Sequence, residues 1–282
     1  MSYRPHANVV PTERAAAETD WIVGRPAELA RLGDCVSGAL SGSPRFLLVE
    51  GPLGIGKSAL LSAAADTAER GGARVLRARG DAGESDLPFG VAGQLFELAL
   101  DGASEDERRR WLHGPADAVR RIVNIDDRGA GRSGESLDGH VASGALYWLT
   151  ANAARRVPLV LVVDDLQWAD AASLRWLIHL SRRMKRLPLA VVAALAPDVP
   201  ESTSSLVAAL SARVERLPLS ALDTASVARL VAEHFGVLPA DGLATRLLAE
   251  TGGNPLLLRN VLAASPDSPT ARATNRSPPC ST

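Results

Sequence analysis

Lysine is almost absent from this sequence of 282 residues. Of its 31 basic residues, only Lys57 and Lys185 are lysines, and the others are arginines. This preference for arginine, together with abundant alanine and glycine, is typical of a GC-rich genome. Because arginine replaces lysine almost everywhere else, we expect a specific chemical requirement for lysine at one of the two positions.

Cysteine, histidine and net charge are also scarce. Two cysteines, Cys35 and Cys280, are too few for a disulfide framework or a four-cysteine metal site, which favours a reducing compartment. The five histidines show no metal-ligand spacing. A formal net charge of −1 provides no basic surplus, so the composition gives no support for a protein that binds nucleic acids or membrane surfaces.

Long apolar runs are missing as well. The longest, Leu159–Val163 and Leu189–Leu195, are far shorter than the ~18 residues that a membrane-spanning helix needs. The first 20 residues are polar and lack the apolar stretch of a secretory signal. We therefore expect a cytoplasmic protein with no membrane partner.

Short apolar runs alternate with helical stretches through the first two thirds of the chain. The runs are almost continuously apolar, which is typical of parallel strands covered on both faces. Their alternation with helices predicts a three-layer α/β sandwich with a central, mainly parallel five-stranded sheet. The expected strands are Phe46–Glu50, Arg74–Ala78, Leu159–Val163, Leu189–Ala194 and Val214–Leu217, and the expected helices among them are Ser58–Arg70, Val141–Arg156 and Ala171–Arg186.

The pattern divides the chain into several parts. A small all-α lid is expected after Pro218, with helices at Thr224–Phe235, Asp241–Thr251 and Pro255–Ala263. Residues 264–282 hold eleven Ser, Thr or Pro and no Leu, Ile, Val or aromatic residue, which predicts disorder. The expected parts are a flexible segment 1–20, a nucleotide-binding domain 21–218 with a mostly helical insertion at about 81–138, the lid 219–263 and the tail 264–282.

One motif fits a phosphate-binding loop at every fixed position. The segment Gly51-Pro52-Leu53-Gly54-Ile55-Gly56-Lys57-Ser58 follows a predicted strand and opens a predicted helix that continues with Ala59. Its glycines let successive N–H groups turn toward an anion, and the helix adds its positive N-terminal end. Lys57 is expected to reach the β- and γ-phosphates and Ser58 to ligate Mg²⁺. The sequence therefore predicts a P-loop NTPase fold that binds ATP and Mg²⁺.

A pair of carboxylates supplies the second half of this expected site. Asp164 and Asp165 follow the apolar run Leu159–Val163, so they lie at the carboxyl edge of the predicted sheet, where a phosphate-bound metal would be. Asp164 is expected to hold the metal, and Asp165 to orient or deprotonate an attacking water. The alternative is that Asp165 only caps the turn that follows.

Several motifs, in this order, resemble those of a known family. They are Val23-Gly24-Arg25 with Glu28-Leu29, the loop EGPLGIGKSALL, LPFGVAGQLFEL at Leu87–Leu98, ALYWL at Ala145–Leu149, VVDDLQWADAASLRWL at Val162–Leu177 and GGNPLLL at Gly252–Leu258. Over roughly Trp21 to Leu262 the chain resembles the ATPase domain of the large ATP-binding LuxR-type transcriptional regulators, which belong to the signal-transducing (STAND) branch of AAA+ proteins.

This resemblance implies roles for further residues and for the whole domain. Val23 and Gly24 match the stretch that passes the adenine, and Pro255 matches the lid proline that packs on the base. Gln167, Trp168 and Asp170 match the segment after the second acidic motif, without a role that the sequence explains. Family members are switches: ADP holds a closed resting arrangement, and ATP with an inducer opens it for self-association.

The sequence also departs from the family pattern. Residues 193–197, after the fourth strand, read Ala-Ala-Leu-Ala-Pro and offer no polar side chain to sense the γ-phosphate, so we expect slow or no hydrolysis. The helical repeats and helix-turn-helix of the family have no counterpart after Ala263. We therefore expect a shortened regulator module with no direct DNA binding from the residues present.

Other interpretations remain open at this stage. The chain could be a stand-alone P-loop kinase or NTP-dependent transferase, although no acceptor-site motif is visible, or a remnant that no longer binds nucleotide. Arg182, Arg183 and Arg186 either reach a neighbouring subunit or form a solvated helix end, which we favour. His179 is expected on a polar helix face or as a satisfied core residue. Three tryptophans, Trp111, Trp148 and Trp176, are expected in the core.

Overall fold

The computed structural model describes residues 22–122, 139–236 and 239–264. These residues divide into two compact units, one of residues 26–220 and one of residues 22–25 with 221–264. The predicted flexible segment 1–20, most of the predicted tail and the part of the insertion at 123–138 lie outside the described residues. Each unit is treated by itself below.

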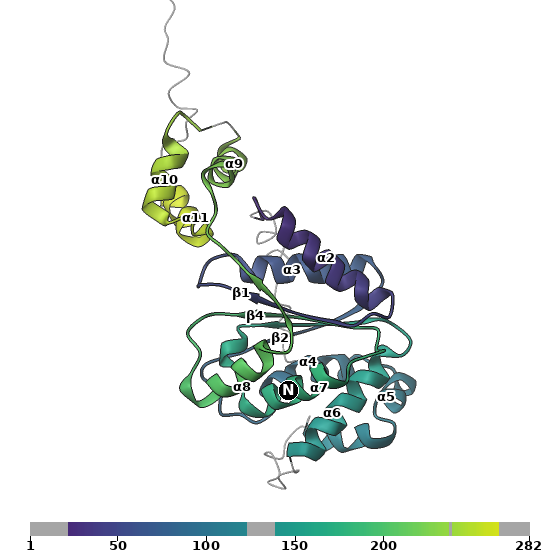
Figure 1. The fold of residues 1–282 in the computed structure, drawn as a ribbon. Helices are drawn as coiled ribbons and strands as arrows, with labels where there is room; N and C mark the ends of the chain where they lie inside the picture. The colour runs from purple at the N-terminus through teal and green to yellow at the C-terminus, as the bar shows by residue number, and fades with distance from the viewer. Residues whose placement is uncertain (1–21, 123–138, 237–238, 265–282) are drawn as a thin grey trace, which may run out of the picture. The chain divides into compact units, whose positions relative to one another are not determined.

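The larger unit is built on a five-stranded sheet, which confirms the predicted α/β sandwich (Figure 1). The strand order is β2-β3-β4-β1-β5, and every pairing is parallel. The chain crosses from β1 to the far edge at β2 and returns through the middle, so β1 and β4 lie side by side. The strands are β1 (Arg45–Glu50), β2 (Arg74–Arg79), β3 (Leu159–Asp164), β4 (Leu189–Leu195) and β5 (Glu215–Pro218).

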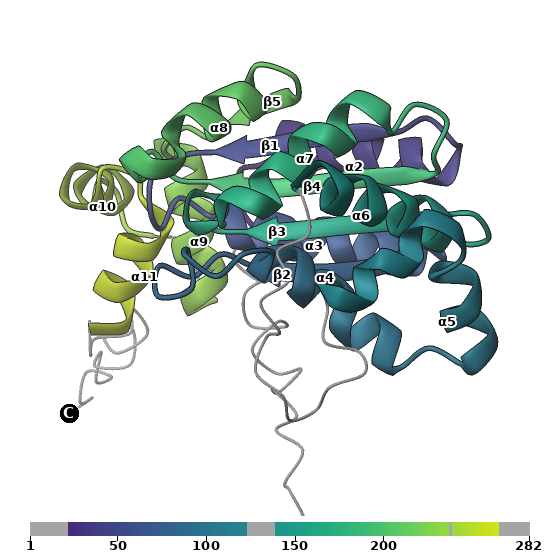
Figure 2. The same cartoon turned by 90° about the horizontal axis from the view of Figure 1, so that it is seen from below.

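Helices cover both faces of this sheet. In Figure 1, α2 and α3 lie above the sheet, and α4 to α8 lie below it. The arrowheads of β1 and β3 point the same way in Figure 2, so the carboxyl ends of the strands share one edge. The helices are α2 (Pro26–Leu40), α3 (Lys57–Arg70), α4 (Gly90–Asp101), α5 (Glu105–Trp111), α6 (Gly139–Ala154), α7 (Ala171–Arg183) and α8 (Glu201–Ser211), with two 3₁₀ turns, η1 (Gly114–Arg121) and η2 (Leu166–Trp168).

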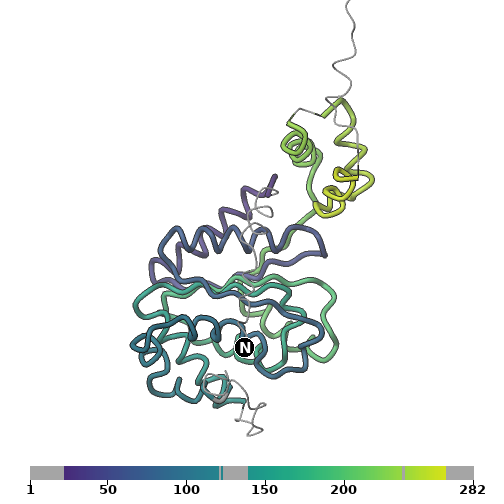
Figure 3. Tube along the Cα trace, turned by 180° about the vertical axis from the view of Figure 1, so that it is seen from behind, coloured from purple at the N-terminus to yellow at the C-terminus, as the bar shows by residue number. Residues whose placement is uncertain are grey.

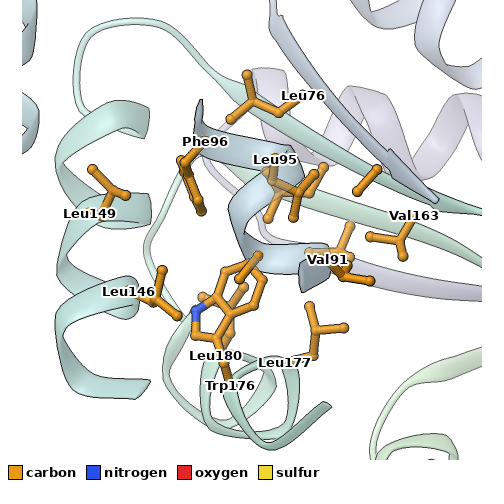
Figure 4. Close-up of a cluster of buried hydrophobic side chains, with 14 of the residues drawn as sticks. Leu76, Val91, Leu95, Phe96, Leu146, Leu149, Val163, Trp176, Leu177 and Leu180 are labelled. Atoms are coloured by element: carbon orange, nitrogen blue, oxygen red, sulfur yellow. The ribbon is translucent and has the colours of Figure 1, made fainter. Parts of the chain in front are cut away.

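The core explains why these apolar runs are strands. All seven residues of β4 are buried, because it lies between two other strands and beneath helices on each face. The largest cluster fills the space between the sheet and the lower helices (Figure 4). At its centre, Phe96 and Trp176 meet edge to face with 6.0 Å between ring centroids. Burial of these rings, together with the many aliphatic side chains around them, drives the packing of this layer.

The structure moves several predicted boundaries by a few residues. The predicted strands all exist, and each lies within two residues of its predicted ends. The helix predicted at Ala171–Arg186 ends at Arg183 instead, with Met184 as its C-cap, and the turn that follows includes Arg186 in a left-handed backbone with φ 76°. The helix predicted at Val141–Arg156 runs from Gly139 to Ala154, where its last turn tightens before Pro158.

The prediction that all three tryptophans lie in the core is wrong for Trp148. Trp111 and Trp176 are buried, but Trp148 is 39% exposed. On α6 it follows Val141 by two helical turns, and Val141 is also exposed, so both lie on the stripe that faces away from the sheet. Its ring meets that of Tyr147 edge to face, at 5.6 Å between centroids.

The smaller unit is all-helical, as predicted. It contains α9 (Thr224–Phe235), α10 (Leu243–Thr251) and α11 (Pro255–Ala264), whose trace is green to yellow in Figure 3. Their apolar faces share a cluster that includes Val227, Leu230 and Leu258. Asp223 caps α9 by accepting from Ser226 N at 2.8 Å. This small core lets three short helices form a unit that none would form alone.

Candidate nucleotide-binding site

The predicted phosphate loop joins β1 to α3 at the carboxyl edge of the sheet. Gly54 and Gly56 have φ angles of 77° and 103°, which side-chain-bearing residues rarely adopt. A Cβ on Gly51 would lie 2.9 Å from the side chain of Ile55, so that position has no room for one. Gly56 leaves the start of α3 without a side-chain cap, and the first N–H groups of the helix are open to an anion.

Lys57 lies across this loop. Its Nζ donates to the carbonyl oxygens of Gly51 at 2.8 Å and Pro52 at 3.0 Å, and the residue is only 6% exposed. Burial lowers the pKa of Lys57, while the nearby carboxylates of Asp165 and Asp164 oppose that shift. Among the described residues Lys57 forms no ion pair. A buried ammonium held only by carbonyl groups is well placed to receive an anion.

Asp164 and Asp165 end β3 beside the loop, at the same edge of the sheet. Asp164 accepts from the Asp165 backbone N–H at 2.9 Å. Asp165 has a left-handed backbone, with φ 49°, before the turn η2. Although it occupies the cap position of that turn, its side chain makes no capping hydrogen bond. The capping alternative is therefore wrong, and both of its carboxylate oxygens have other partners.

Those partners include an arginine that the sequence interpretation missed. Arg79, the last residue of β2, donates from Nε to Asp165 Oδ2 at 2.8 Å and forms an ion pair with it at 2.6 Å. The hydrogen bond and charge of Asp165 raise the pKa of Arg79. The strand register pairs Arg79 with Asp164. Finding Arg79 from the sequence would have required knowing that β2 pairs with β3. The sequence does not specify that pairing.

Gln167 connects the ends of two strands. Its Nε2 donates to Asp165 Oδ1 at 3.0 Å, and its Oε1 accepts from Ala196 N at 3.0 Å. Ala196 is the residue directly after β4, so the amide of Gln167 ties the end of β4 to Asp165 after β3. This gives Gln167 the role that the sequence left unexplained.

Asp170 fastens two helices together behind the site. It caps α7 by accepting from Ser173 N at 2.8 Å, and it also accepts from Phe89 N at 2.8 Å and Val91 N at 3.3 Å. It is only 3% exposed. Close packing continues at Gly80, where a Cβ would lie 2.3 Å from Asp165 O. The segment from Gln167 to Asp170 thus stabilises the turn that follows Asp165.

The remaining predicted residues belong to the helical unit. Val23 is buried in its core with residues of α9, and Gly24 packs so closely on α9 that a Cβ would lie 2.0 Å from Ser226 Oγ. Pro255 is the first residue of α11 and is half-buried. The structure therefore brings the loop and the two carboxylates together in one unit, and holds Val23, Gly24 and Pro255 in the other.

The described residues also limit the kind of metal site that is available. Among them, no three His, Cys, Asp or Glu side chains gather to hold a metal ion. Ser58 is exposed at the start of α3, and Asp164 is half-buried. One hydroxyl and one carboxylate fit Mg²⁺, which retains several waters and takes further ligands from phosphates. None of the helices in residues 22–122, 139–236 and 239–264 combines the length and apolar character needed to cross a bilayer.

Comparison with known proteins places this site in a family. The model of the AAA ATPase domain matches residues 22–192, which is more than half of the chain. The chain therefore belongs to the AAA ATPase domain family.

A curated relative is an uncharacterized protein of Rhizobium meliloti. It is 26% identical over 274 residues, a match that covers 85% of this chain and 24% of that protein. The chain thus spans about a quarter of the relative's length, and the relative's name assigns no activity.

Solved structures share the fold. One is a signal transduction ATPase with numerous domains (STAND) protein with a tetratricopeptide repeat sensor, from Pyrococcus horikoshii. It aligns with a TM-score of 0.52 and 18% identity over 87% of this chain and 30% of that one. Another is the ORC2 protein of Aeropyrum pernix, solved in ADPNP and ADP complexes. It aligns with a TM-score of 0.52 and 16% identity over 92% of this chain and 64% of that one.

Proposed function

We propose that this chain is an ATP- and Mg²⁺-binding module that acts as a nucleotide-dependent switch. The observation that carries the proposal is the buried Lys57, held across a glycine-rich loop with no carboxylate partner among the described residues. The loop backbone and the start of α3 would hold the phosphates, with contacts from Gly51 to Ala59. Lys57 would neutralise the β- and γ-phosphates.

The metal would be held by Ser58 and Asp164. The hydroxyl opens α3 and the carboxylate ends β3, so both are at the carboxyl edge of the sheet. When bound, Mg²⁺ would neutralise phosphate charge. This assignment gives Asp164 a distinct role from Asp165, whose two oxygens already have protein partners.

Slow or absent hydrolysis follows from the state of Asp165. As a catalytic residue it would have to orient or deprotonate water. Here Arg79 and Gln167 occupy its oxygens, so a water would have to compete with both partners. Residues 193–197 add no donor for the γ-phosphate. These features support a switch in which bound ATP is hydrolysed slowly or not at all.

The proposed context is a LuxR-type regulator of the STAND branch. The Asp-Asp-Leu-Gln-Trp-Ala-Asp and Gly-Asn-Pro strings support it, as does the shared fold with a STAND protein. In this proposal, ADP holds the resting state, and ATP with an unknown inducer shifts the helical unit and allows self-association. Val23, Gly24 and Pro255 would contact the adenine. No direct DNA contact is proposed for these residues.

Thermal melting tests whether the chain binds nucleotide. Saturating ATP with Mg²⁺ should stabilise the wild-type protein by about 2.7 kcal/mol when ATP is about 100-fold above its Kd. Lys57→Ala should remove this stabilisation. Lys185→Ala removes the other, exposed lysine and should melt like the wild type with and without ATP. No shift in the wild type would contradict the proposal.

A further inference from the structure

A second hollow lies at the amino edge of the sheet, away from the phosphate loop. It has a volume of about 460 Å³, within the usual range for small-molecule sites. Arg74, at the start of β2, lies in its wall, whereas the site of Asp165 lies beyond the other end of β2. Along a strand these ends are about 16 Å apart. Figure 2 shows α5, which lines the hollow, at the end of the sheet opposite the arrowheads.

Three elements bring an unusual number of arginines to this hollow. Arg74 begins β2, Arg109 and Arg110 lie in the last turn of α5, and Arg155 and Arg156 follow the end of α6. These positions are far apart in the sequence and converge only through the fold. We call the five residues the arginine pocket. In a chain with a formal net charge of −1, this is a local concentration of positive charge.

Most of this charge is not neutralised by the protein. Arg74 forms an ion pair with Glu107 at 2.9 Å, and Arg109 forms one with Asp106. In the described ranges, Arg110, Arg155 and Arg156 have no ion-pair partner. The pocket therefore carries a positive excess that attracts anions, and the concave wall strengthens that attraction compared with a flat surface.

One wall of the pocket, around Arg74 and Trp111, is held in shape. The guanidinium of Arg74 lies 4.6 Å from the centre of the buried ring of Trp111, so its position is fixed between that ring and Glu107. Asn152 Nδ2 donates to the carbonyl oxygens of Trp111 and His113, each at 3.0 Å, and ties the turn after α5 to α6. A side chain held in this way loses less entropy when it binds a ligand than a mobile one does, whereas the other four arginines of the pocket are exposed.

The chemistry of the walls defines the ligand class. Guanidinium groups match carboxylate and phosphate oxygens with paired hydrogen bonds. Ala153 and Val157 add apolar surface beside them. We propose that the arginine pocket binds a small organic anion with two or more carboxylate or phosphate groups on a short carbon body, independently of the nucleotide site.

To test this, two probes are titrated into the Lys57→Ala protein at low salt, and binding is measured by calorimetry. Citrate represents carboxylate ligands and pyrophosphate represents phosphate ligands. The Lys57→Ala background removes the main competing phosphate contact, and Mg²⁺ is left out because both probes chelate it. Binding of either probe supports the pocket, and the stronger probe identifies the preferred group. The outcome does not depend on whether the wild type binds ATP.

Matched variants locate the binding. Arg155→Ala with Arg156→Ala should weaken the stronger probe by about tenfold or more, because charge-assisted contacts are lost. Both residues are exposed and outside regular elements, so the fold should be retained. Arg229→Ala with Arg246→Ala removes the same charge from exposed positions of the helical unit and should leave binding unchanged. Equal losses in both variants, or no binding of either probe, would overturn the proposal.

A nucleic acid is the competing ligand for such a cluster. A short duplex DNA is therefore titrated into the same proteins, with citrate as competitor. Binding of DNA that depends on Arg155 and Arg156, without binding of either small probe, would assign this surface to nucleic-acid backbone contacts. That result would overturn the small-anion assignment. Displacement of any weakly bound DNA by citrate would support it.

Discussion

At the scale of single residues, the ion pair of Arg79 and Asp165 lies at the carboxyl edge of the sheet, where we propose that nucleotide binds. Asp165 would be free to accept a proton from water only if Arg79 left it. Arg79 itself is mostly exposed, with 73% of its side chain accessible, so it can leave without a large packing change. In the proposed function the pair would restrain Asp165, and an exposed pair of this kind adds little to stability.

Arg79→Ala should raise the rate of ATP hydrolysis, by up to about 100-fold, because it frees Asp165 to act as a general base. Single-turnover assays with saturating ATP and Mg²⁺ measure this directly. Arg77→Ala is the matched control, since Arg77 lies on the same strand and pairs with Glu69 instead. A slower or unchanged rate in Arg79→Ala, with ATP binding intact, would show that Arg79 does not restrain Asp165.

At the scale of helices and strands, α7 connects the site to the core. Asp170 caps the helix and binds the start of α4, while Trp176 packs in the core with no hydrogen-bond partner for its buried Nε1. His179 lies one turn before the end of α7, beside Arg183, whose NH1 approaches its ring nitrogens to 2.8 and 3.0 Å. We therefore expect substitutions at the two ends of this helix to change the stability of the protein in different ways.

Asp170→Ala should lower the free energy of unfolding by about 3 kcal/mol, because it removes a helix cap and leaves buried N–H groups without an acceptor. Urea unfolding monitored by circular dichroism measures the change. Ser104→Ala removes the exposed cap of α5 in the same unit and should cost only about 1 kcal/mol. Equal costs would mean that the bonds from Asp170 to α4 contribute nothing.

His179 predicts a pH dependence of stability. Burial, Arg183, Arg182 and His140 lower its pKa below the ordinary 6.5. Below pH 6.5 the unfolded chain therefore takes up a proton that the folded chain resists, so stability falls as the pH drops through 6.5 toward the lowered pKa. His179→Gln should lose less stability over that window in urea unfolding. An identical pH profile for both proteins would exclude this role for His179.

The elements also show which features the sequence predicts. The strands and the phosphate loop were predictable, because a buried apolar run and a glycine-rich turn are local patterns. Trp148 was not, since only the packing of α6 decides which stripe faces the sheet. Arg79 was missed, and the role of Gln167 was not found, for the same reason: their partners, Asp165 and Ala196, depend on strand order and register, which no short motif encodes.

At the scale of the whole molecule, the chain combines an AAA ATPase domain with a small helical unit. The family match and the shared fold with STAND and ORC2 proteins agree with the strand order and the loop. The amino edge of the same sheet carries the arginine pocket, so the two proposed anion sites lie at opposite edges of one sheet. One contains a buried lysine and two aspartates, and the other contains arginines.

The most direct test of the central claim is a calorimetric titration of ATP with Mg²⁺ into three proteins. The wild type and Lys185→Ala should bind with the same Kd. Lys57→Ala should bind about 10- to 100-fold more weakly, because it loses charge-assisted contacts to the phosphates. Equal affinity of the wild type and Lys57→Ala would contradict the account.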